Sequence, residues 1–129
     1  MIWLDFETRS ECDLKLHGAY NYAAHPSTQV LCASYAVDNE EVRTGPLPDL
    51  GAHQIRAHNA GFERLILKYC LGLDLPIERF YCTATQARAN CMPGSLGDVG
   101  RFTGGAMRKD HRGAALIRRP GLIAHMPCA

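Results

Sequence analysis

Apolar and polar residues alternate at the start of the chain, and this pattern predicts a β-strand over residues 2–7. Successive side chains of a strand point to opposite faces of its sheet. One face should therefore present Trp3, Asp5 and Glu7, while the other face presents Ile2, Leu4 and Phe6. The two acids are expected to lie side by side on a buried strand.

Further along, the pattern predicts more strands and then an alternation of strands and helices. Residues 30–37 are apolar and β-branched, and the turn signal at Asp38-Asn39 favours a return as a third strand at 41–44. The later predicted elements are a strand at 55–58, a helix over Ala60–Leu71 that ends at Gly72, a strand at 79–82, and a helix at 83–90 capped by Thr83. Ser95 can cap a further helix, and residues 10–28 support no clear prediction.

In the helix over Ala60–Leu71, the apolar stripe is expected to consist of Phe62, Leu65, Ile66 and Tyr69. Three strands followed by alternating strands and helices are typical of an α/β domain with a mixed sheet. The chain has 129 residues, which suffices for one domain with a core. The fold class expected from the pattern alone is therefore α/β.

The composition indicates an ordinary globular protein. Hydrophobic residues make up 47% and charged residues 21%, as in ordinary globular proteins. No apolar run approaches the roughly 20 residues that span a bilayer, and Asp5 and Glu7 interrupt the place of a signal peptide. A cytoplasmic protein with no membrane partner is expected. The six cysteines show no CxxC pair, so most are expected to be buried, reduced thiols.

The net charge is +1, and the charged residues are distributed unevenly along the chain. Residues 1–100 hold eight basic and twelve acidic side chains, whereas residues 101–119 hold six basic side chains and only Asp110 as an acid. An acidic first part with a basic segment after it would suit a metal site that acts on a phosphodiester. A solvated helix face explains the basic run equally well. Both interpretations stay open here.

The acidic pair is the main candidate for chemistry. Two carboxylates on a buried strand repel each other, and a divalent cation between them would remove that cost. Mg²⁺ binds carboxylate oxygens and retains several waters. The pattern Asp5-x-Glu7 thus favours metal-assisted hydrolysis.

A second acid-bearing segment follows the strand at 55–58. It reads His58-Asn59-Ala60-Gly61-Phe62-Glu63, with the carboxylate in the first turn of the predicted helix. Helix N-termini favour acids, and ligands bind near the carboxyl ends of strands in α/β sheets. Glu63 is a candidate third oxygen donor that faces Asp5 and Glu7. A helix-start acid with no further role is the alternative.

At this point a family resemblance becomes specific. The segment Leu4-Asp5-Phe6-Glu7-Thr8-Arg9-Ser10 resembles the first motif of the DEDD (DnaQ-like) 3′–5′ exonucleases, as found in the proofreading domain of phage-type family A DNA polymerases. Residues 57–64 resemble the second motif. The other similar segments are Asp13-Leu14-Lys15, Gly18-Ala19-Tyr20, residues 25–32, Cys82-Thr83, residues 93–96, Lys109-Asp110, Gly113 and Leu116-Ile117. The resemblance covers residues 1–119.

The resemblance implies a ribonuclease H-like fold, with a mixed five-stranded sheet whose first three strands form an antiparallel meander, flanked by helices. It also implies two Mg²⁺ or Mn²⁺ ions, bound by Asp5, Glu7 and Glu63 together with a fourth carboxylate. The implied reaction is hydrolysis of the 3′-terminal phosphodiester of single-stranded or frayed DNA. The resemblance further implies that Asn59 and Phe62 shape the pocket, and that the backbone around Phe6 and Thr8 meets the terminal nucleotide.

The chain departs from that family in two ways. Glu63 occupies the place of a shorter Asp, and Mg²⁺ is sensitive to ligand geometry. The third motif, which supplies a Tyr or His and the fourth metal-binding Asp, is absent, and residues 120–129 form an off-family tail. Asp110 and His111 are not expected to replace it. We therefore expect a domain at 1–119 with an incomplete C-terminal part, separated from the polymerase domain by truncation or a frameshift.

Three hypotheses follow from these observations. The first is a 3′–5′ exonuclease weakened by the missing motif, since the loss of a general base costs roughly 10²–10⁴ in rate. The second is an inactive remnant that binds nucleic acid through residues 101–119. The third is a chain that folds incompletely. The sequence does not distinguish DNA from RNA as substrate, and it does not predict an oligomeric state.

Overall fold

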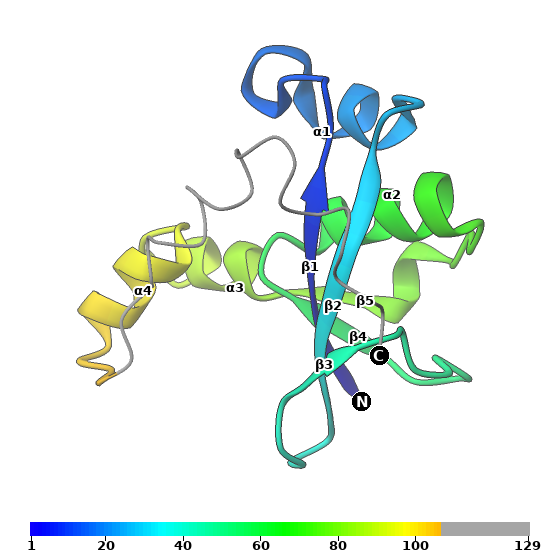
Figure 1. Ribbon diagram of the computed structural model, residues 1–129. Helices are drawn as coiled ribbons and strands as arrows, with labels where there is room; N and C mark the ends of the chain where they lie inside the picture. The colour runs from blue at the N-terminus through cyan, green and yellow to red at the C-terminus, as the bar shows by residue number, and fades with distance from the viewer. Residues whose placement is uncertain (107–129) are drawn as a thin grey trace.

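The computed structural model describes residues 1–106, and it shows one five-stranded sheet with helices around it (Figure 1). The strands are β1 (Ile2–Arg9), β2 (Gln29–Val37), β3 (Arg43–Gly45), β4 (Ile55–Ala57) and β5 (Phe80–Cys82). The helices are α1 (Leu14–Ala24), α2 (Ala60–Leu71), α3 (Thr83–Ala89) and α4 (Leu96–Phe102), with a short 3₁₀ turn η1 (Ile77–Arg79) before β5. None of the helices in this part of the chain is long and apolar enough to cross a membrane.

The strand order is β3-β2-β1-β4-β5, so the first strand of the chain lies at the centre of the sheet. β1 pairs antiparallel with β2, and β2 pairs antiparallel with β3. β4 lies parallel to β1, and β5 lies parallel to β4. This arrangement confirms the α/β class and the mixed sheet with an initial meander. It is compatible with a ribonuclease H-like fold.

Local signals explain where most helices begin and end. The Asp13 carboxylate accepts hydrogen bonds from the backbone N–H groups of Lys15 and Leu16 and caps α1. α1 is interrupted at Gly18, whose φ of 79° lies outside the helical region. α2 ends at Gly72 in the left-handed conformation, as predicted. Ser95 caps α4 by accepting a hydrogen bond from the N–H of Asp98.

The third strand and the cap of α3 differ from the prediction. The third strand forms at Arg43–Gly45 rather than at 41–44. Thr83 does not cap α3, because it is the first helical residue and Cys82 is at the N-cap. The Thr83 hydroxyl instead contacts the ring of His58 and donates to the carbonyl oxygen of Ala57. Thr83 therefore ties the end of β4 to the start of α3.

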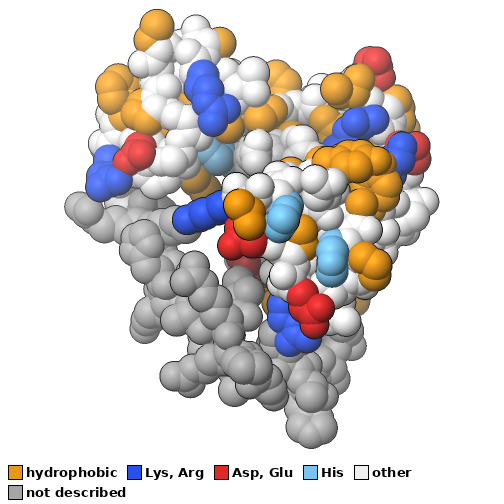
Figure 2. All heavy atoms as spheres, turned by 90° about the horizontal axis from the view of Figure 1, so that it is seen from above, with side chains coloured by type: hydrophobic (Ala, Val, Ile, Leu, Met, Phe, Trp, Pro, Cys, Tyr) orange, Lys and Arg blue, Asp and Glu red, His pale blue; other side chains and the backbone are white. Residues whose placement is uncertain are grey.

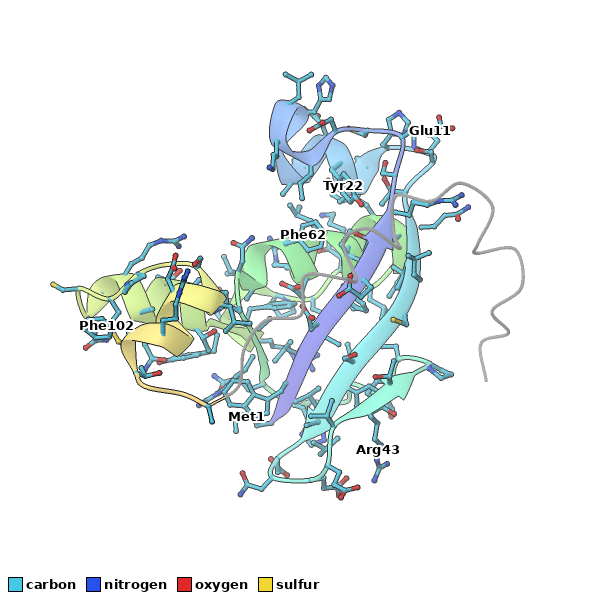
Figure 3. The ribbon with its side chains drawn as sticks, turned by 60° about the vertical axis from the view of Figure 1, so that its left-hand side comes forward. Met1, Glu11, Tyr22, Arg43, Phe62 and Phe102 are labelled. Atoms are coloured by element: carbon cyan, nitrogen blue, oxygen red, sulfur yellow. The ribbon has the colours of Figure 1, made fainter. Side chains whose placement is uncertain are left out.

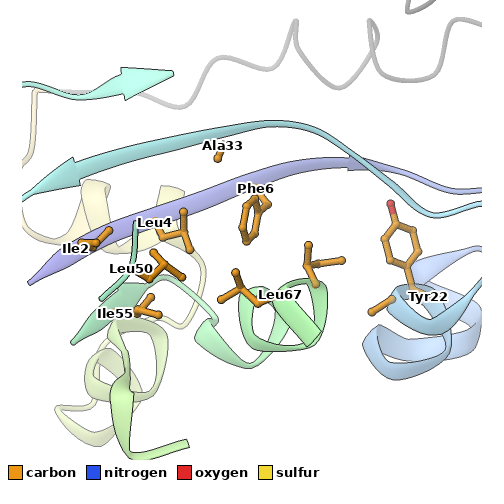
Figure 4. Close-up of a cluster of buried hydrophobic side chains, with 10 residues drawn as sticks. Ile2, Leu4, Phe6, Tyr22, Ala33, Leu50, Ile55 and Leu67 are labelled. Carbon is orange, nitrogen blue, oxygen red and sulfur yellow. The ribbon is translucent and has the colours of Figure 1, made fainter. Parts of the chain in front are cut away.

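The core lies between the sheet and α2 (Figure 4). Ile2, Leu4 and Phe6 point from β1 into this layer, while Ile66 and Leu67 fill it from the helix. α1 adds Tyr22, whose ring lies 5.9 Å from the ring of Phe62 on α2 (Figure 3). The core therefore fixes α2, and with it the helix N-terminus, against the central strand.

Truncating the core should destabilise the whole domain. Leu67 has no exposed surface, so Leu67→Ala is expected to lower the free energy of unfolding by about 2–5 kcal/mol. Leu16→Ala is the matched control, because Leu16 is 77% exposed on α1 and its loss should change this free energy by about 0.5 kcal/mol or less. Urea unfolding of both variants measures the difference. Equal values would mean that α2 does not pack on the sheet as described.

The cysteines differ from expectation. Cys12, Cys32, Cys70 and Cys82 are half-buried, Cys91 is exposed, and all five are free thiols. None of the cysteines within residues 1–106 is fully buried, because they lie at the margins of the core rather than inside it. The prediction that most cysteines are buried is therefore wrong for this part of the chain.

Candidate metal centre

Asp5 and Glu7 lie on the central strand, on the face opposite the core. The side chains of β1 alternate between buried and exposed up to Glu7, which confirms that the two acids share one face. That face is exposed, however, so the predicted burial of the acidic pair is wrong. The core layer covers only the opposite face of β1, which leaves these two carboxylates in contact with water.

The strand pairing becomes irregular immediately after Glu7. Asp5 is opposite Ser34 and Glu7 is opposite Cys32, but Thr8 is opposite Val30, so β2 carries one extra residue at this point. Bulges of this kind bend a strand and change the direction of the neighbouring side chains. The acidic pair therefore lies just before a bend in the sheet.

Glu63 is the buried acid of this region. It lies in the first turn of α2 and is only 3% exposed. Its Oε2 atom has no hydrogen-bond partner, although buried polar atoms are normally paired. The buried side of α2 consists of Ala60, Glu63, Ile66 and Leu67, whereas Tyr69 is exposed. Of the predicted apolar stripe, Ile66 is buried and Phe62 and Leu65 pack against the core, so the prediction is wrong only for Tyr69, and a carboxylate occupies part of the buried side.

Burial and nearby negative groups make Glu63 difficult to ionise. Desolvation is the largest cause and raises the pKa of Glu63 to about 8, while a bond to its own backbone N–H lowers it. The charges of Asp5 and Cys82 contribute to the same rise. Asp5 and Glu63, which are 58 positions apart in sequence, are therefore close enough to interact electrostatically across β1 and α2.

Cys82 lies at the end of β5, next to the start of α2. Burial raises the pKa of the Cys82 thiol, but hydrogen bonds outweigh burial and lower the pKa to about 7. The donors are the side chain and backbone N–H of Thr85 and the backbone N–H groups of Ala60 and Asn59. No sequence pattern indicates this environment, because it depends on two chain segments that meet only in the fold.

The predicted substrate-contacting residues have different surroundings. The side chain of Phe6 lies in the core, so only its backbone can face a ligand on the acidic side. The Thr8 hydroxyl lies 2.9 Å from the hydroxyl of Tyr22. Asn59 is exposed and begins α2 in the left-handed conformation, and Phe62 packs on Tyr22. Thr8 and Phe62 thus meet at Tyr22, which the sequence did not indicate as part of the site.

His58, which directly follows β4, connects this strand to two later segments. One ring nitrogen lies 3.0 Å from the Thr83 hydroxyl and the other lies 2.9 Å from the carbonyl oxygen of Gly94. The ring therefore joins β4 to α3 and to the loop before α4. α3 and α4 lie beside one another at one side of the sheet (Figure 1).

Among the three predicted metal ligands, the charge of Asp5 influences the pKa of Glu63. Asp5 and Glu63 interact, but no three His, Cys, Asp or Glu side chains within residues 1–106 are grouped closely enough to hold one ion. The set of Asp5, Glu7 and Glu63 therefore stays a prediction. Lys109, Asp110 and most of the basic run at 101–119 lie outside the described residues.

These observations define an α/β domain with carboxylates on the central strand and at the start of the helix that follows β4. The chain is similar to the DNA polymerase of Bacillus phage SP02, with 32% identity over 128 residues. The similarity covers 89% of this chain but only 20% of that polymerase, so the chain spans about a fifth of its relative. No family model matches the chain. The similarity is consistent with a domain derived from a polymerase.

Proposed function

We propose that this chain is a metal-dependent 3′–5′ exonuclease domain derived from a phage DNA polymerase. The main support is the buried Glu63 carboxylate of α2, whose pKa is raised in part by the charge of Asp5 on the central strand, so that these two acids from distant segments influence each other. The similarity to a phage DNA polymerase supports DNA as the substrate. In this proposal, the end of a single-stranded or frayed DNA lies over the exposed face of β1.

The side chains present fit a hard divalent cation. The unpartnered Oε2 of Glu63 needs either a hydrogen-bond donor or a cation, because an unpaired buried oxygen is costly. Mg²⁺ and Mn²⁺ prefer oxygen ligands, and Mg²⁺ is often bound by one or two carboxylates, waters and substrate phosphates. Asp5 and Glu63 would bind the ion, with Glu7 as a further ligand. Such ions supply charge stabilisation and an activated water in phosphodiester hydrolysis.

The chain itself would contribute the positions of the reacting groups. α2 holds Glu63 against the core, so its carboxylate has little freedom to move. Asp5 and Glu7, on one face of β1, would orient the attacking water and the scissile phosphate. The exposed backbone beside Glu7 and Thr8 would contact the terminal nucleotide.

A nuclease assay tests this proposal. The chain should shorten a 5′-labelled single-stranded oligonucleotide one nucleotide at a time when Mn²⁺ is present, and EDTA should stop the reaction. A denaturing gel would show a ladder that shortens from the 3′ end. Internal cuts, or cleavage that continues in EDTA, would contradict an exonuclease of this kind.

A second candidate function is an inactive remnant that binds DNA. The observation in its favour is that the described residues contain no group of three metal-ligating side chains. On the face seen in Figure 2, Lys and Arg side chains alternate with Asp and Glu side chains, so no broad basic patch is visible there. Salt-sensitive DNA binding without any Mn²⁺-dependent cleavage would favour this second function.

A further inference from the structure

A row of three side chains crosses the sheet beside Asp5. The strand register places Trp3 of β1 next to Arg56 of β4, and Arg56 next to Tyr81 of β5. The guanidinium carbon of Arg56 lies 5.5 Å from the ring centre of Trp3 and 4.7 Å from the ring centre of Tyr81. A guanidinium within about 6 Å of an aromatic ring is attracted to its face. The two rings therefore hold the cation in a fixed place on the sheet.

Arg56 is a cation with unused hydrogen-bonding capacity. Its Nε atom is buried and has no hydrogen-bond partner. Arg56 forms no ion pair with any side chain in the part of the chain that the structure describes. A guanidinium has five N–H donors, and its planar form suits a phosphate better than an ammonium does. An anionic ligand would give these donors partners.

The row borders a hollow of about 260 Å³ that also reaches Asp5. Trp3, Asp5 and Arg56 line it, together with Val42, His58 and Leu96. Trp3 is 39% exposed, so part of its ring is accessible. Aromatic surfaces of this kind stack with the bases of single-stranded nucleic acids. The hollow thus combines an apolar wall, an aromatic ring and a cation.

We propose that this hollow, named here the Trp3–Arg56 site, binds a nucleotide of single-stranded DNA next to the reacting one. Arg56 would bind the backbone phosphate, and the base would stack on Trp3. Trp3 lies two residues before Asp5 on the same face of β1, which corresponds to roughly 6–7 Å along a strand. This separation is on the scale of one nucleotide step in an extended single strand.

The inference rests on the proposed function, because it takes Asp5 as the reaction centre. Its test is therefore a binding measurement without metal or hydrolysis. Fluorescence anisotropy of a labelled oligothymidylate in EDTA would compare the unchanged protein with Arg56→Gln and Trp3→Ala. Each variant should bind about tenfold more weakly, through loss of a charged hydrogen bond or of one stacked base. For Arg56→Gln, the plot of the logarithm of the binding constant against the logarithm of the salt concentration should be less steep by about 0.7.

Lys15→Gln is the matched control. It removes the same charge from an exposed position on α1, which lies at the other end of β1 from the N-terminus (Figure 1). Its affinity should equal that of the unchanged protein. If Arg56→Gln and Lys15→Gln bind alike, or if the unchanged protein does not bind the oligonucleotide, the inference is overturned.

Photo-cross-linking of the unchanged protein keeps the test valid even if a variant fails to fold. Trp3 is the single tryptophan of the chain. An oligonucleotide with 5-iododeoxyuridine should cross-link to the peptide that contains Trp3, and a cross-link only elsewhere would overturn the site. If both binding and cross-linking occur as expected but no Mn²⁺-dependent cleavage is found, the proposed function fails while the Trp3–Arg56 site stands.

Discussion

Asp5→Asn is expected to reduce Mn²⁺-dependent exonuclease activity by about 10²-fold or more. Asparagine has nearly the same shape but no negative charge, and loss of a metal-ligating group removes both affinity and orientation. Asp5 is the predicted ligand whose charge raises the pKa of Glu63, so its loss should affect the shared ion most. The rate of shortening of a 5′-labelled oligonucleotide at saturating Mn²⁺ measures the effect.

Asp49→Asn is a suitable control for this variant. Asp49 is exposed in a loop, and its Oδ1 accepts a hydrogen bond from the N–H of Gly51, which asparagine can also accept. Its activity should match that of the unchanged protein. Calorimetric titration with Mn²⁺ provides a second measurement, in which Asp5→Asn should bind roughly 10–100-fold more weakly. Equal rates and equal Mn²⁺ affinities would exclude Asp5 from the reaction.

Glu63→Gln is expected to stabilise the metal-free protein at alkaline pH. The pKa of Glu63 is raised from 4.5 to about 8 in the folded protein, so the folded state retains a proton that the unfolded state loses. The contribution of Glu63 to the free energy of unfolding is therefore greatest below about pH 4.5, falls as the pH rises towards 8, and changes no further above it. A shift of this size corresponds to a loss on the order of 4–5 kcal/mol. Glutamine is never ionised, so Glu63→Gln should avoid this loss.

Urea unfolding in EDTA at about pH 5 and about pH 8 measures this effect. The free energy of unfolding of the unchanged protein should decrease between the two pH values by several kcal/mol more than that of Glu63→Gln. Glu78→Gln alters an exposed carboxylate beside β5 and should follow the unchanged protein. Adding Mn²⁺ should reduce the difference, because a bound cation favours the ionised carboxylate. Identical pH profiles for all three proteins would mean that Glu63 is solvated.

The sequence predicted the sheet well because its strongest signals are local. Alternation in β1 and the apolar run of β2 identified the two long strands, and Gly72 identified the end of α2. α1 was missed, since Gly18 interrupts it after one turn and no continuous periodicity remains. The Asp13 cap was a usable signal for its start. Thr83 was wrongly predicted to be a helix cap. Local sequence shows only that a threonine can cap a helix, whereas the hydroxyl of Thr83 contacts His58, a partner that is close only in the fold.

The candidate site was only partly predictable. The shared face of Asp5 and Glu7 follows directly from strand geometry, but exposure of that face depends on which side the helices cover. Glu63 is buried because it lies on the same side of α2 as Ala60, Ile66 and Leu67, which the apolar pattern did not indicate. No sequence pattern indicated that Arg56 or Cys82 belongs to a site. Their neighbours lie on other strands and helices, and the local sequence does not specify how those elements pair.

The central place of β1 has a consequence for synthesis of the chain. β1 is synthesised before the other strands of the sheet, but its parallel neighbour β4 begins more than 50 positions later. Until β4 and α2 have been synthesised, neither of them can pack on the apolar side of β1. Nascent segments with exposed apolar side chains associate readily with one another. Loss of β1 would remove the middle of the sheet rather than an edge, so a chain without this strand should not assemble this fold at all.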